Sequence, residues 1–216
     1  MLLYRHGYLL LSLIAALLSV LCSSCKEEEG TNNEYDNWQA RNERFFASLE
    51  DSMQQDAAHW QRFQTVTATD APTDPTKYIY VKRLRSDDEV REVNDALNWE
   101  TSDEKPLYTD SVRVAYRGRL IPSASHPNGL SFDYTYVGAY DRATTATKRF
   151  LVQGMVEGFT TALVNMKRGE RWMVYIPHQL GYGSTEQNTI PAYSTLIFDI
   201  DLFDFCHVGS QLRPWQ

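Results

Sequence analysis

The spacing of hydrophobic and polar positions changes along the chain, and each change predicts a different element. From Glu34 to Phe63 the apolar residues recur every three, four or seven positions, with charged residues between them and no Gly or Pro. This spacing predicts one amphipathic helix, or two in succession. We expect the stripe to pack on the domain that follows; the alternative is a homodimer through this N-terminal helix. The stripe consists of Trp38, Phe45, Leu49, Met53, Trp60 and Phe63.

A linker and one strand follow this region. The stretch TATDAPTDPTK, Thr67 to Lys77, is rich in turn-forming residues and predicts a linker. YIYVKRL, Tyr78 to Leu84, has the composition of a strand, and the acidic stretch up to Pro106 predicts either a loop or a short helix.

After Pro106 the apolar residues alternate, which is the period of a strand. The stretch SVRVAYRGRL predicts a half-buried strand, and LSFDYTY and KRFLV predict shorter ones. In RWMVYIP the alternation places three apolar residues on one face, and STLIFDIDLFDF places Asp199 and Asp201 outward. The inward residues of these last two strands are Trp172, Val174, Ile176, Leu196, Phe198, Ile200 and Leu202.

One helix lies among these strands. Phe159, Leu163 and Met166 fall at the spacing of one helix face, a basic pair follows them, and Gly169 suits the left-handed residue that ends a helix. A short helix enclosed by an antiparallel sheet predicts an α+β architecture.

The N-terminus has the layout of an export signal. Arg5 lies in a basic start, and the apolar run from Tyr8 to Leu21 is 14 residues long, short of the roughly 20 that span a bilayer. Two serines precede Cys25, which resembles the lipobox of a bacterial lipoprotein, in which that cysteine is lipidated. We therefore expect a lipoprotein signal peptide at 1–24; the alternative is ordinary signal-peptidase cleavage without a lipid.

The three cysteines agree with this interpretation. Cleavage removes Cys22, acylation uses Cys25, and Cys206 is left without a partner, so no disulfide is expected. The stretch KEEEG that follows Cys25 resembles a surface-export signal of some Gram-negative bacteria, although it could be a solvated linker at 25–33. The prediction is a lipid-anchored protein of the bacterial outer membrane, exposed at the cell surface or on the periplasmic face.

Composition narrows the function. A chain of 216 residues with 43% hydrophobic and 23% charged residues is globular, and a net charge of −7 argues against nucleic-acid binding. The five histidines lack metal-ligand spacing, and GYGST lacks the serine of a nucleophile elbow. We expect neither a metal nor a cofactor.

Six blocks, in order and at fitting spacing, carry a family resemblance: VAYRGRL, SFDY, MVEGF, MKRGERWMVYIP, LGYG and IPAYSTLIFDIDL. Together they resemble the FK506-binding-protein (FKBP) family of peptidyl-prolyl isomerases. The resemblance implies a curved antiparallel sheet wrapped around one short helix, with the active pocket between them. It divides the chain into an N-terminal amphipathic helix region at 34–66, a linker with one strand at 67–106, and an FKBP-type domain at 107–206.

The resemblance also implies roles for single residues. Phe159 occupies the pocket floor, where the family usually has tryptophan, and Lys148 occupies a place where the human-type pocket has an aromatic residue. The implied substrate-binding residues are Met155, Val156, Phe159 and Ile190. The implied catalytic residues are Tyr116, Phe132, Asp133, Tyr182 and Phe198.

The implied activity is cis-trans isomerisation of X-Pro bonds in exported or surface proteins, with proline-containing polypeptides as partners. The alternative is a binding or chaperone module of the same fold with weak catalysis.

Overall fold

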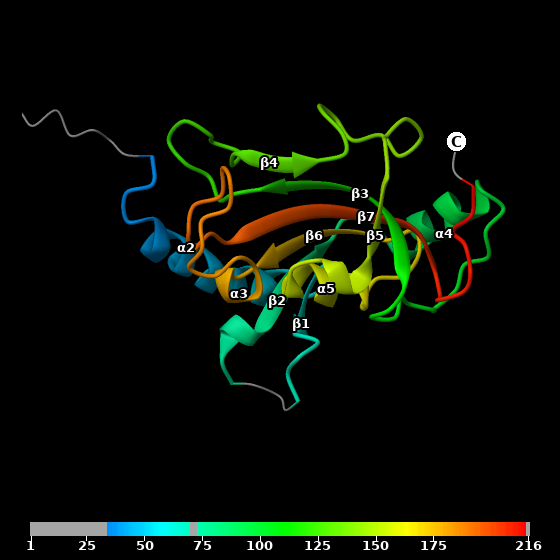
Figure 1. Ribbon diagram of the computed structural model, residues 1–216, viewed down its shortest axis with the longest axis horizontal. Helices are drawn as coiled ribbons and strands as arrows, with labels where there is room; N and C mark the ends of the chain where they lie inside the picture. The colour runs from blue at the N-terminus through cyan, green and yellow to red at the C-terminus, as the bar shows by residue number, and fades with distance from the viewer. Residues whose placement is uncertain (1–33, 70–72, 215–216) are drawn as a thin grey trace, which may run out of the picture. The chain divides into compact units, whose positions relative to one another are not determined.

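The computed structural model describes residues 34–69 and 73–214. The predicted signal peptide, Cys25 and the acidic linker lie outside these residues. The described part contains a seven-stranded antiparallel sheet with strand order β1-β2-β6-β7-β3-β4, and β5 also pairs with β3 (Figure 1). The short helix α5 packs on one face of this sheet, so the predicted α+β architecture is confirmed.

The helices and strands have the following bounds. The helices are α2 (Trp38–Ala47), α3 (Leu49–Gln55), α4 (Asp87–Asp95) and α5 (Glu157–Leu163). The strands are β1 (Trp60–Gln64), β2 (Tyr78–Arg83), β3 (Ser111–Arg119), β4 (Ser131–Tyr134), β5 (Lys148–Leu151), β6 (Arg171–Ile176) and β7 (Leu196–Cys206). Single 3-10 turns are η1 (Pro75–Lys77), η2 (Val152–Gly154) and η3 (His178–Leu180).

Close packing of α5 on the sheet depends on Gly158. A Cβ atom built on Gly158 would lie 2.3 Å from Cγ2 of Ile176 on β6, so only glycine allows the helix to approach this closely. On the same helix, Phe159 and Leu163 are fully buried against the sheet. The helix and strand of the stretch 158–177 are therefore in direct contact, as the sequence predicts.

The predicted N-terminal helical region, which runs to Phe63, extends beyond the last helical residue in the structure. The helix ends at Gln55, and a turn at Asp56 leads into β1, which pairs with β2. Trp60 and Phe63, three positions apart, suit a helix face; in β1 they stack instead on Tyr175 and Trp172 of β6. Pairing and ring stacking across the sheet outweigh the local helical spacing.

The apolar stripe of α2 and α3 packs within the chain. Trp38 belongs to the main core, while Phe46 and Leu49 form a second cluster with Trp60 and Tyr80 on β1 and β2. The expected packing of the stripe on the following domain is confirmed, and the homodimer stays a prediction.

The prediction that Asp201 faces outward is only half right. Asp201 does lie on the face of β7 opposite α5, but it is fully buried. It accepts hydrogen bonds from Arg85 at 2.9 Å and also from Arg142 and Tyr140, and the last two residues belong to the segment between β4 and β5. The covering segment is polar itself, so no periodicity signals its presence. Burying a carboxylate requires this pairing, because an isolated charge would be strongly destabilising.

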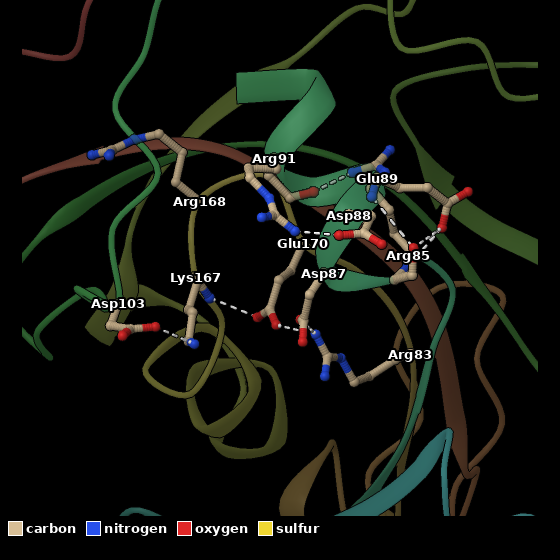
Figure 2. Close-up of polar contacts among 12 residues, drawn as sticks. Arg83, Arg85, Asp87, Asp88, Glu89, Arg91, Asp103, Lys167, Arg168 and Glu170 are labelled. Carbon is tan, nitrogen blue, oxygen red and sulfur yellow. Dashed lines mark hydrogen bonds and ion pairs between the residues drawn. The ribbon is translucent and has the colours of Figure 1, made fainter. Parts of the chain in front are cut away.

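The acidic stretch before Pro106 contains a helix, α4, and Arg83 of β2 forms ion pairs both with Asp87 of this helix and with Glu170 in the turn before β6 (Figure 2). Glu170 in that turn accepts hydrogen bonds from the Lys167 N–H at 2.7 Å and from Arg83 at 3.2 Å. Gly169 has the predicted positive φ of 87°, but α5 already ends at Leu163, so the glycine forms the turn into β6 and does not end the helix.

Two further findings concern membrane-spanning helices and cysteines. Within the described residues, no helix is long and apolar enough to cross a membrane. In the same part of the chain, Cys206 is a free, half-buried thiol.

Candidate active site

A pocket of about 370 Å³ opens between α5 and the sheet. All nine predicted substrate-binding and catalytic residues line it. Four other residues complete the lining: Gly154, Gln187, Asn188 and Thr189. The nine come from β3, β4, the start of α5, β7 and the loop at 181–195, so the fold brings together residues up to 82 positions apart in the sequence.

Aromatic rings form the inner part of the pocket, arranged edge to face. Phe159 on α5 meets Phe198 on β7 with 5.0 Å between ring centroids and an 89° interplanar angle. Its ring is 6.1 Å from that of Tyr116 on β3, and Phe132 on β4 lies 5.4 Å from Phe198 at 88°. Such edge-to-face contacts are favourable arrangements of aromatic rings. The result is an apolar pocket floor of packed aromatic rings.

Gly118 makes room for these rings. It follows Tyr116 by two positions on β3 and therefore lies on the same face of the strand. A Cβ atom there would lie 2.6 Å from ring atoms of both Phe132 and Phe198. Two rings therefore occupy the space that a side chain at this position would need.

One side of the pocket is polar. The Tyr116 hydroxyl donates to a carboxylate oxygen of Asp133 at 2.7 Å, and Lys148 Nζ lies 3.4 Å from the same hydroxyl. Burial raises the pKa of Tyr116, and the hydrogen bond to Asp133 raises it further. Burial also raises the pKa of Tyr182, with a smaller contribution from Asp133. Both phenols therefore stay protonated at neutral pH and remain hydrogen-bond donors.

Met155 and Val156 occupy the entrance to α5. Both are half-buried, and Val156 is the residue that caps the helix N-terminus. The first N–H groups of a helix have no acceptor within it. The Val156 N–H, which precedes the first helical turn, is therefore not used by the helix itself.

Sequence reasoning missed the polar residues Gln187, Asn188 and Thr189. They belong to the irregular loop at 181–195, in which an isolated bridge joins Gln187 and Ile190. Loop residues have no hydrophobic period, so spacing cannot identify them. The adjacent motifs LGYG and IPAYS are the signal that could have located this wall.

A model of the family described as FKBP-type peptidyl-prolyl cis-trans isomerase matches residues 102–203. This match spans the strands, the helix and the loop that form the pocket. This stretch, which makes up just under half of the chain, is similar to the FKBP family. The match begins a few residues before the predicted domain start at 107.

Curated FKBP-type relatives share this part of the chain. FkpA of Escherichia coli K12 is 35% identical over 101 residues, which are 47% of this chain and 33% of FkpA. The FKBP-type 22 kDa isomerase of the same strain is 29% identical over 154 residues, covering 69% of this chain and 66% of that protein. The chain thus spans about one third of FkpA and less than two thirds of the first relatives it matches.

The solved structures support the fold. A peptidyl-prolyl cis-trans isomerase from Pseudomonas syringae pv. tomato superposes with a TM-score of 0.52 at 22% identity, covering 82% of this chain and all of that one. At this identity the similarity concerns the FKBP-type fold alone.

Proposed function

We propose that this chain is a peptidyl-prolyl cis-trans isomerase that acts on X-Pro bonds without a covalent intermediate. The observation that carries the proposal is the aromatic pocket formed by Tyr116, Phe132, Phe159 and Phe198. It lies within the part of the chain that matches the FKBP family.

The pocket suits this reaction because amide resonance is what limits rotation about the X-Pro bond. Amide resonance opposes rotation with a barrier of about 20 kcal/mol. The twisted transition state has lost this resonance, so its carbonyl is less polar than that of the planar amide. An apolar pocket that binds the twisted amide better than the planar one lowers the barrier. A 10³-fold acceleration requires only about 4 kcal/mol of such differential binding.

The polar residues would orient the peptide around the proline ring. We assign the pocket floor to Phe159 and the walls to Phe132, Phe198 and Ile190. The Tyr182 hydroxyl and the Val156 N–H would donate to substrate carbonyls. Asp133, held by Tyr116, would place a carboxylate near the X-Pro amide. These groups bind and orient the substrate; the mechanism needs neither a nucleophile nor proton transfer.

The assay is isomerisation of short X-Pro peptides, followed by coupled proteolysis of the trans form. We expect turnover, with a preference for an apolar residue before proline because the pocket floor is apolar. A Phe198→Ala variant serves as the inactive reference. Rates equal to the uncatalysed reaction across a peptide panel, together with retained peptide binding, would favour the alternative of a binding or chaperone module.

We further propose that the protein acts on proline-containing exported polypeptides in the cell envelope. The export-type N-terminus supports this location. The finer proposal is a lipid anchor on Cys25 in the outer membrane, with the domain on the surface or the periplasmic face. Cys25→Ala should then move the protein from the membrane fraction to the soluble fraction, and unchanged fractionation would contradict the anchor.

A further inference from the structure

One wall of the pocket is an irregular loop that needs external support. The loop at 181–195 connects η3 to β7 and supplies Tyr182 and Ile190 to the pocket. Asn188 and Tyr193 have positive φ angles of 50° and 62°. Residues with a Cβ atom adopt this conformation at a cost, so contacts elsewhere must hold the loop in place.

Two buried side chains of α2 hold the end of this loop. The Trp38 indole N–H donates to the Ser194 hydroxyl at 2.8 Å, and the Thr195 N–H donates to the Asn42 side-chain oxygen at 2.7 Å. All four residues are less than 7% exposed. The Asn42 amide nitrogen also donates to the Trp38 carbonyl at 2.8 Å, which fixes the orientation of the Asn42 side chain. Figure 1 shows the loop, in orange, beside α2, in blue.

The hydrogen bonds continue from α2 to the pocket. The Ser194 hydroxyl, which accepts from Trp38, donates in turn to the Pro191 carbonyl at 2.6 Å. Pro191 directly follows Ile190, which lines the pocket and is 5% exposed. A hydroxyl that accepts one hydrogen bond donates a stronger one, so the two bonds reinforce each other. Movement of Trp38 would therefore be transmitted to the residue next to the pocket wall.

We propose that Trp38 and Asn42 are positioning residues for the pocket. They do not line it themselves. They fix the loop at 181–195 and thereby the position of Ile190 against the substrate. Both residues lie outside the part of the chain that matches the family, residues 102–203. The N-terminal helix would thus be a component of peptide recognition as well as a packing element. The expected change in KM rests on the proposed isomerase function, whereas the role of Trp38 and Asn42 in fixing the loop does not.

The test compares two buried asparagines in the full-length chain. Asn42→Ala removes the acceptor for the Thr195 N–H. Asn94→Ala is the matched control, because Asn94 is equally buried and its amide donates to the Arg168 carbonyl, but it belongs to α4 and has no contact with the loop. We expect Asn42→Ala to raise KM for an X-Pro peptide about tenfold with kcat nearly unchanged. Asn94→Ala should lower the melting temperature and leave KM unchanged.

Hydrogen exchange gives a readout that does not depend on catalysis. The amides of residues 187–195 should exchange faster in Asn42→Ala than in the wild type, and no faster in Asn94→Ala. If the wild type shows no turnover but the exchange differs in this way, the isomerase proposal fails and the positioning role stands. Equal KM values and equal loop exchange in the two variants would overturn the positioning role.

A second variant covers the case in which Asn42→Ala fails to fold. Trp38→Phe keeps an aromatic ring in the core, although a smaller one, and removes the indole N–H that reaches Ser194. It should also raise KM. Adding it to Ser194→Ala should change KM little further, because Ser194→Ala alone already breaks the Trp38–Ser194 hydrogen bond. Additive effects of the two substitutions on KM would contradict the proposal.

Discussion

At the scale of single residues, Gly118 controls how closely the aromatic rings approach in the pocket. We predict that Gly118→Ala displaces Phe132 and Phe198, because its Cβ atom would lie 2.6 Å from both rings. Peptide affinity should fall by about tenfold, since the rings move into the space that the proline ring needs.

Gly158→Ala is the comparison for this prediction. Its Cβ atom would meet Ile176 in the core and not a pocket ring, so overpacking should cost about 1–3 kcal/mol of stability. Thermal melts and peptide titrations on both variants separate the two effects. Equal losses of affinity in both variants would contradict the role given to Gly118.

Glu34 provides a pH-dependent contact at the start of the described chain. Hydrogen bonds from the Ser123 and Ser125 hydroxyls lower the pKa of Glu34 from its ordinary value of 4.5 to about 2. A carboxyl whose pKa is lower in the folded state than in the unfolded state stabilises the fold at pH values above its unfolded-state pKa. That stabilisation disappears as the pH falls through the folded-state pKa.

We therefore expect Glu34→Gln to melt at a lower temperature than the wild type at pH 7. The difference should decrease as the pH falls from about 4.5 to about 2, which is the interval between the two values of the pKa. Melting curves over a pH series measure this. A difference that stays constant across the series would show that the charge of Glu34 is not involved.

At the scale of elements, α4 begins with a complete capping box. The Ser86 hydroxyl accepts from the Glu89 N–H, and the Glu89 carboxylate accepts from the Ser86 N–H at 2.7 Å. Ser86→Ala should lower the free energy of unfolding by about 1 kcal/mol. Ser86→Thr should retain most of the stabilisation that the capping box provides. Because α4 does not line the pocket, peptide turnover should not change. Denaturant unfolding and the isomerase assay together check both expectations.

The success of sequence reasoning also differs from element to element. The strand at Arg171–Ile176 was predictable because its alternating apolar residues face one core, and all three of them are buried. The strand at Trp60–Gln64 was not, because two aromatic residues three positions apart suit a helix equally well. Only the partner strand β2 and the rings of β6 decide between the two, and neither is local in sequence.

The same limit applies to the candidate site. The family blocks predicted nine of the residues that line the pocket, because most of these residues stand at fixed places on strands or at the start of a helix. They could not predict that Asn42 and Trp38 reach the loop beside Ile190, since hydrogen bonds between residues more than 150 positions apart leave no local pattern. Asp201 is a similar case. The alternation of apolar and polar residues along β7 predicts that its carboxylate faces solvent, but the polar segment between β4 and β5 covers it.

At the scale of the whole molecule, the N-terminal region completes the sheet. Strand β2 pairs with the edge of β6, β1 pairs with β2, and α2 and α3 cover Trp60 and Tyr80. We predict that a fragment starting at residue 102, where the family match begins, is less stable than the chain starting at 34 and associates more readily. Its β6 edge would be unpaired and apolar rings would be exposed. Light scattering and melting curves of the two fragments test this. Equal stability and a monomeric short fragment would contradict it.

The strand order has a consequence for how the protein must be made. Strand β7, the last strand of the described residues, lies in the middle of the sheet between β6 and β3. A chain emerging from its N-terminus would therefore hold β3 and β6 apart, each with an unpaired edge, until β7 was available. Completion of the sheet is then coupled to the synthesis of β7. The sheet stays open for as long as β7 is withheld, and a polypeptide in that state can pass through a narrow channel.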